Sequence, residues 1–177
     1  MNALLVIDVQ KGLVTGAYNE TAVLQAINVV ISAVRAEGGL IIFVLHCHSA
    51  YEPMMKNAPG WQLHNSLDAR DTDIRVEKEA SDAFFETDLD AVLTKAEVEH
   101  VYVTGLQTEF CVDATCRAAL SHGYNVTLIS DGHTTGDAVL KAADTIAHHN
   151  YSLQNLAHPN REITLCSSTD LAAHNPT

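Results

Sequence analysis

An alternation of continuous apolar runs with amphipathic stretches is the feature that most constrains this fold. Six apolar runs are strand candidates, at residues 3–8, 40–46, 73–78, 100–106, 125–130 and 163–167. Most are apolar throughout, which is typical of strands buried on both faces of a parallel sheet. Between these runs, apolar residues recur at the spacing of one helical turn, which indicates helices at residues 23–34, 89–93, 112–120 and 139–147. This order predicts a single α/β domain over residues 1–177, with a doubly wound, mainly parallel six-stranded sheet and helices on both faces.

The charge balance excludes some classes of partner. The chain has 22 Asp and Glu against 10 Lys and Arg, which gives a formal net charge of −12. Nucleic acids and anionic membranes are bound through basic patches, so we expect neither as a partner. We find no secretion signal or membrane-spanning run, and the four cysteines form no CxxC pair. We therefore expect a cytoplasmic protein with free thiols.

The segment from 47 to 71 is long and irregular, and it contains the only tryptophan, Trp61. Long loops in compact domains are usually functional. We expect this one to form a pocket wall; the alternative is a floppy insertion.

Polar residues follow three of the predicted strands. Asp8 and Lys78 end the first and third strands, and Cys111 comes one turn after the fourth. The carboxyl ends of parallel strands share one rim, so these side chains are expected to meet there. A helix N-terminus after the strand is expected to lower the pKa of the Cys111 thiol. Taken singly, each residue has a structural alternative: a loop cap, a solvated lysine and a buried cysteine.

A carboxylate, an ammonium and a thiol in one pocket fit acyl transfer. The carboxylate can take the thiol proton and later give it to a leaving group. The ammonium stabilises both anions, and the backbone N–H groups of Gln107 and Cys111 can form an oxyanion hole. The reaction would pass through a thioester, with water as the final acceptor.

Three segments, at residues 5–10, 77–84 and 105–112, resemble the signature segments of the isochorismatase-like cysteine hydrolases. They read Leu-Val-Ile-Asp-Val-Gln, Glu-Lys-Glu-Ala-Ser-Asp-Ala-Phe and Gly-Leu-Gln-Thr-Glu-Phe-Cys-Val. The resemblance implies that Asp8 is the base, Lys78 supports the thiolate and Cys111 attacks. It also implies a Rossmann-like three-layer fold, a cis peptide between Leu106 and Gln107, and a homo-oligomer, either a dimer or a tetramer.

That family contains nicotinamidases and carbamoyl-amine amidohydrolases, which need a thiol, and isochorismatases, which cleave a vinyl ether without one. Because Cys111 is present, we expect hydrolysis of a C–N bond in a small amide, ureido or carbamoyl compound. The alternatives are vinyl ether hydrolysis and a catalytically inactive, small-molecule-binding member of the fold.

No cofactor or metal is expected. Nicotinamidases bind a metal through an Asp-x-His motif, and the matching place here reads His46, Cys47, His48. With His64 these side chains are chemically able to bind zinc if they converge. The residues expected to line the substrate pocket are Gln10, Tyr18, His46, Trp61 and Phe84.

Overall fold

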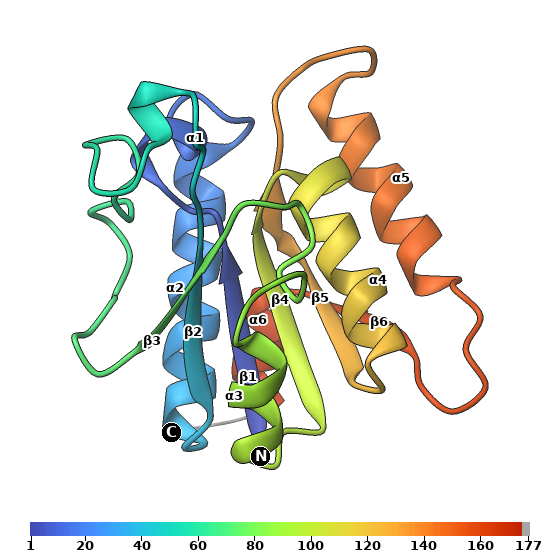
Figure 1. Ribbon diagram of the computed structural model, residues 1–177. Helices are drawn as coiled ribbons and strands as arrows, with labels where there is room; N and C mark the ends of the chain where they lie inside the picture. The colour runs from blue at the N-terminus through green and yellow to red at the C-terminus, as the bar shows by residue number, and fades with distance from the viewer. Residues whose placement is uncertain (175–177) are drawn as a thin grey trace.

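Six parallel strands form the centre of the computed structural model, which describes residues 1–174 (Figure 1). They are β1 (Asn2–Ile7), β2 (Leu40–His46), β3 (Ile74–Lys78), β4 (His100–Leu106), β5 (Asn125–Thr134) and β6 (Ile163–Cys166). Their order is β3-β2-β1-β4-β5-β6, and all neighbours pair in parallel. The predicted doubly wound parallel sheet is therefore confirmed. The strand order reverses direction between β1 and β4, where open α/β sheets bind ligands.

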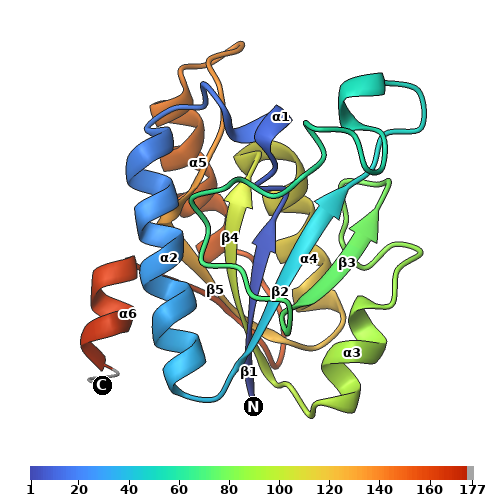
Figure 2. The ribbon, with the colours of Figure 1, turned by 90° about the vertical axis from the view of Figure 1, so that its left-hand side faces the viewer.

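Both faces of the sheet are covered by helices (Figures 1 and 2). One face packs against α2 (Glu20–Ala36) and α6 (Ser168–His174). The other packs against α3 (Leu89–Lys95), α4 (Asp113–Ser121) and α5 (Ala142–Gln154). Successive side chains of a strand point to opposite faces, so Leu5 and Val6 of β1 enter different clusters, and both are fully buried. This double burial explains the continuous apolar runs.

The prediction of a helix from residue 139 was wrong at its start. Val139 and Leu140 lie in the connection after β5, with 99% and 55% of their surface exposed. The helix α5 begins at Ala142, whose backbone N–H donates to Asp137 Oδ1 at 2.9 Å. Asp137 thus accepts a hydrogen bond from the first turn of α5, as expected of a cap. The prediction was wrong because two apolar residues in an exposed loop have the spacing of a helical face.

The connection from β2 to β3 packs on the molecule and is not a floppy insertion. It contains the short helix η1 (Glu52–Met54), and Leu63 forms an antiparallel bridge with Gln10. Trp61 and Leu63 pack against the cluster under α2. A small helix, α1 (Lys11–Val14), lies beside this connection, because Lys11 N–H donates to Gln62 O at 2.9 Å. No helix among residues 1–174 combines the length and the apolar character needed to cross a membrane.

Gly105 lets β1 and β4 approach each other at the switch point. Its φ is +114°, and a Cβ at this position would clash with the backbone of Ile7. We therefore expect Gly105→Ala to lower the free energy of unfolding by about 3 kcal/mol or more, measured by urea denaturation. Gly136→Ala is the matched control, because a Cβ there meets nothing within 4 Å. A Gly105→Ala protein as stable as the control would contradict this account.

Candidate active site

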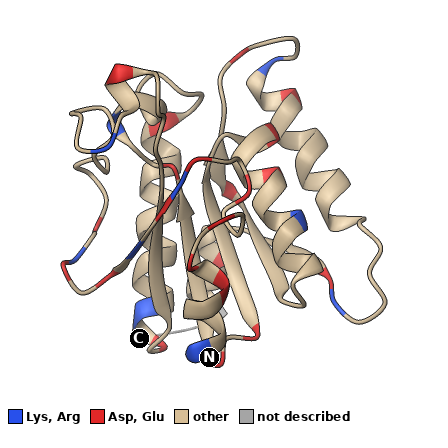
Figure 3. Cartoon of the chain, viewed as in Figure 1, with Lys and Arg blue, Asp and Glu red and all other residues tan. Residues whose placement is uncertain are grey.

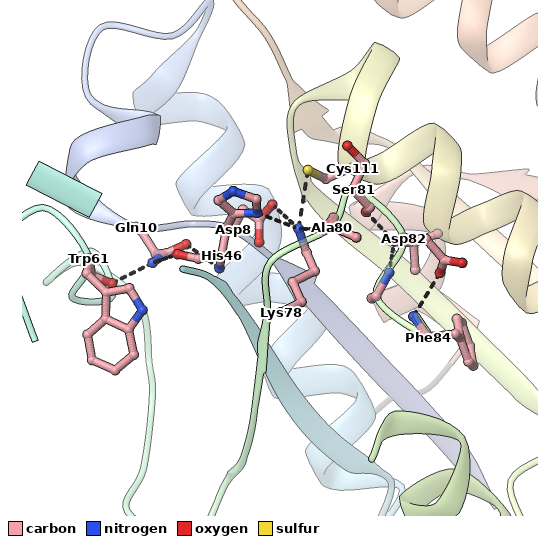
Figure 4. A network of polar contacts seen from close by, with 12 residues as sticks. Asp8, Gln10, His46, Trp61, Lys78, Ala80, Ser81, Asp82, Phe84 and Cys111 are labelled. Atoms are coloured by element: carbon pink, nitrogen blue, oxygen red, sulfur yellow. Dashed lines mark hydrogen bonds and ion pairs between the residues drawn. The ribbon is translucent and has the colours of Figure 1, made fainter. Parts of the chain in front are cut away.

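The carboxyl ends of four strands bring the candidate residues together. Asp8 follows β1 directly, and Cys111 lies in η2 (Thr108–Val112), a short π-helical turn between β4 and α4. Lys78 ends β3, and its register partner on β2 is His46. Lys78 stands two strands away from β1, so its long side chain crosses the end of β2 to reach Asp8 (Figure 4).

The Lys78 ammonium is the centre of this arrangement. Its Nζ donates to Asp8 Oδ2 at 2.8 Å and to Ala80 O at 3.0 Å. It also lies 3.3 Å from Cys111 Sγ and 3.3 Å from His46 Nδ1. An ammonium only donates, so the His46 Nδ1 lone pair is directed at Lys78. The side chains of Lys78 and Asp8 are 0% and 2% exposed, so water does not reach the ion pair.

Asp8 has the features expected of a proton acceptor. Its backbone has a left-handed φ of 54°, an uncommon conformation that often occurs at functional sites. Within residues 1–174, Asp8 Oδ1 is buried without a hydrogen-bond partner. Burial raises the pKa of Asp8 above its ordinary value, and the neighbouring Lys78 charge opposes this effect. A raised pKa makes this carboxylate a stronger base than an exposed aspartate.

The expectation of a lowered thiol pKa was wrong. Burial, and after it the charge of Asp8, raises the pKa of Cys111 to about 11, although Lys78 acts in the opposite direction. Cys111 lies inside the π-helical turn and not at the start of α4, and its burial there disfavours the charged thiolate. A thiol with this pKa is neutral near pH 7, and it lies beside the Asp8–Lys78 ion pair.

A buried network that the sequence analysis did not identify supports the turn of Cys111. The peptide bond between Leu106 and Gln107, which the sequence analysis did name, is cis, and η2 begins directly after it. Thr108 Oγ1 lies 2.9 Å from His133 Nδ1, and His133 Nε2 lies 2.9 Å from Asn150 Oδ1. Burial lowers the pKa of His133 to about 4, so the ring is neutral. His133 lies near the carboxyl end of β5, and the same search for polar residues at strand ends would have found it.

The residues expected to line the pocket lie in different places. Gln10 is fully buried and joins two segments: its amide accepts from His46 N and donates to His46 O and Trp61 O. The indole N–H of Trp61 points to Cys47 Sγ at 3.1 Å. Tyr18 is 41% exposed, and its backbone N–H donates to Thr135 O.

Phe84 is directed away from the rim and into the core. It is 7% exposed, and its ring stacks on His122 with a centroid separation of 4.6 Å. Its aromatic character is used for packing against the α3–α4 side of the sheet, so it is not part of the pocket wall.

A cavity of about 630 Å³ opens beside Lys78. Its lining residues are Cys47, Lys56, Glu77, Lys78, Glu79, Ala80, Phe85 and Glu86. Lys56 is paired with Glu77 at 2.6 Å, which leaves the lining with an excess of carboxylates. In the view of Figure 3, Lys and Arg are scattered along the cartoon and form no continuous basic stretch.

The histidines considered as metal ligands do not gather at one point. His48 Nδ1 accepts from Ala50 N and Tyr51 N, and His64 lies near Glu20, with 3.9 Å between His64 Nε2 and Glu20 Oε1. His46 instead joins Asp8 and Cys111, and ligand atoms of these three residues lie within 4.8 Å of one another.

Comparison with known proteins identifies the family. A family model described as the isochorismatase domain matches residues 2–168. The chain belongs to the isochorismatase family. It is similar to streptothricin hydrolase of Streptomyces noursei, with 36% identity over 143 residues, 77% of this chain and 56% of the relative. The chain thus spans little more than half the length of that relative.

Two further proteins are similar to this chain, one in sequence and one in structure. Ureidoacrylate amidohydrolase RutB of Klebsiella pneumoniae subsp. pneumoniae is 27% identical, and the match covers 80% of this chain and 77% of the relative. A crystal structure described as an isochorismatase family protein superposes with a TM-score of 0.84 at 34% identity. That superposition covers 94% of this chain and 98% of the other.

The neutral thiol leads to a prediction about alkylation. The rate at which iodoacetamide labels Cys111 should rise about tenfold per pH unit from neutral pH towards pH 10, because thiolate is scarce below a pKa of about 11. Peptide mass spectrometry identifies the labelled thiol. Asp8→Asn should shift this profile to lower pH, and Lys78→Met to higher pH. If iodoacetamide already labels Cys111 at its maximal rate at pH 7, the thiol pKa is not raised and this account is contradicted.

Proposed function

We propose that this isochorismatase-family chain hydrolyses a C–N bond in a small amide, ureido or carbamoyl compound through a thioester on Cys111. The observation that carries the proposal is the contact of one buried ammonium, Lys78, with both the Asp8 carboxylate and the Cys111 sulfur. The names of two relatives support it: one is a streptothricin hydrolase and the other a ureidoacrylate amidohydrolase. We propose no metal or cofactor for the reaction, because Lys78 already supplies the positive charge.

Acylation would begin with the neutral thiol. As Cys111 Sγ attacks the carbonyl carbon, its proton passes to Asp8, whose unpartnered oxygen is buried in the site. Thiolate character develops only during attack, when the negative charge moves to the substrate oxygen. The backbone N–H groups of Gln107 and Cys111 are our candidates for binding that oxygen.

Collapse of the tetrahedral intermediate would break the C–N bond. Asp8 gives its proton to the leaving nitrogen, which departs as ammonia or an amine, and the acyl group remains on sulfur. Water then attacks the thioester while Asp8 takes one of its protons. The carboxylic product leaves, the proton returns to the Cys111 sulfur, and the Asp8–Lys78 ion pair is restored.

Removal of the nucleophile tests this reaction. A panel of small amides, ureas, carbamates and vinyl ethers should contain a substrate whose turnover is lost in Cys111→Ala. Intact-mass spectrometry of the wild type should detect the acyl adduct, and Cys166→Ala, which changes a thiol outside the site, should retain it. Vinyl ether cleavage that survives in Cys111→Ala would favour the isochorismatase-type alternative. Tight binding without turnover would favour the inactive member.

Asp8 leads to a separate prediction about pH. It must be ionised to accept the thiol proton, so kcat/KM should fall as the solution is acidified through its pKa. Since burial raises this pKa, the fall should be centred above the ordinary value of 3.8. Asp8→Asn should lower kcat by roughly 10²–10⁴. A variant with wild-type kcat would remove Asp8 from the mechanism.

A further inference from the structure

Three side chains around the Lys78 ammonium are typical ligands of zinc. Ligand atoms of Asp8, His46 and Cys111 all lie within 4.8 Å of one another. Zinc bonds to such atoms are roughly 2.0–2.3 Å long, so tetrahedral ligands lie roughly 3.3–3.8 Å apart. The three side chains therefore need to draw together by only about 1 Å to share one ion.

Two observations indicate that Asp8 and His46 have lone pairs available to bind a metal ion. Asp8 is 1% exposed, yet its Oδ1 has no hydrogen-bond partner among the described residues. The Nδ1 lone pair of His46 is directed at the Lys78 ammonium. If the ammonium moves away, this lone pair becomes available to a metal ion. Figure 4 shows these groups turned towards the same point from different strand ends.

That point is already occupied by a cation. Lys78 Nζ lies 2.8 Å from Asp8 Oδ2 and 3.3 Å from Cys111 Sγ. The residue Lys78 also lines the cavity of about 630 Å³, where Glu77, Glu79 and Glu86 contribute carboxylates, although its side chain is buried. A lysine side chain is flexible, so on displacement it can rotate, and these carboxylates offer it acidic partners other than Asp8.

We propose that Asp8, His46 and Cys111 form an inhibitory Zn²⁺ site, which the metal enters by displacing the Lys78 ammonium. As the Zn–S bond forms, the Cys111 thiol releases its proton to solvent, and Lys78 keeps its own. No electron transfer is involved, and water completes the tetrahedral shell. The site captures the nucleophile and the base together, so the loaded enzyme is inactive whatever bond it cleaves.

The binding test uses Co²⁺ as a spectroscopic probe on the full chain after chelation with EDTA. The wild type should bind one equivalent with a thiolate-to-cobalt charge-transfer band, and Zn²⁺ should displace it. Cys111→Ser should lose the band, and His46→Gln should weaken binding on the order of tenfold or more. Circular dichroism checks that each variant is folded. The readout is independent of turnover, so it stands even if the proposed hydrolysis is not found.

Lys78→Met separates displacement from ordinary binding. Without the Lys78 ammonium, Co²⁺ and Zn²⁺ should bind roughly tenfold more tightly or better. The metal ion then no longer has to displace a positive charge from the site. Unchanged or weaker binding in Lys78→Met would overturn the displacement.

Cys47→Ser and His64→Gln are the matched controls and should bind as the wild type does. No binding in the wild type, a band that persists in Cys111→Ser, or a band lost in Cys47→Ser would each refute the site. Where a substrate is available, Zn²⁺ should stop turnover and EDTA should restore it.

Discussion

The buried ammonium of Lys78 is the interaction on which the site depends. A charge removed from water is costly unless it is paired and its donors are satisfied. Asp8 supplies the opposite charge, and Ala80 O, His46 Nδ1 and Cys111 Sγ lie within reach of the same group. One positive and one negative charge balance, so a second anion on sulfur would leave the site with an uncompensated charge. The charge of Asp8 thus adds to burial in raising the pKa of the Cys111 thiol.

The strand order brings Asp8 and Cys111 together. Asp8 and the turn of Cys111 follow two adjacent strands, β1 and β4, from which the chain winds in opposite directions. The close approach of these strands at Gly105 leaves no room for a side chain. Behind the turn, His133 connects Thr108 to Asn150 of α5, so the position of Cys111 is supported by a helix that carries no proposed catalytic residue. The rigid sheet thus places reactive groups from segments that are far apart in the sequence.

Much of this could be predicted from local patterns. Apolar runs, most of them continuous, indicated the six strands, because strands buried on both faces of a parallel sheet are apolar along their whole length. The runs at 40–46 and 100–106 match β2 and β4 to the residue. Polar residues after such runs indicated Asp8, Lys78 and Cys111, because strand ends are where a buried sheet meets solvent. The start of α5 and the placement of Phe84 were missed, because apolar residues mark a loop, a core or a pocket wall equally well.

The sequence by itself determined which side chains stand at the ends of strands and which chemistry they are able to perform. Only the tertiary structure decided which atoms meet. The approach of His46 to Lys78 depends on strand register, and the unpartnered oxygen of Asp8 depends on how side chains from three strands pack. The thiol pKa of about 11 has the same origin. Desolvation is set by every atom around a group, whereas a sequence motif reports only its covalent neighbours, so the burial that raises this pKa could not be anticipated.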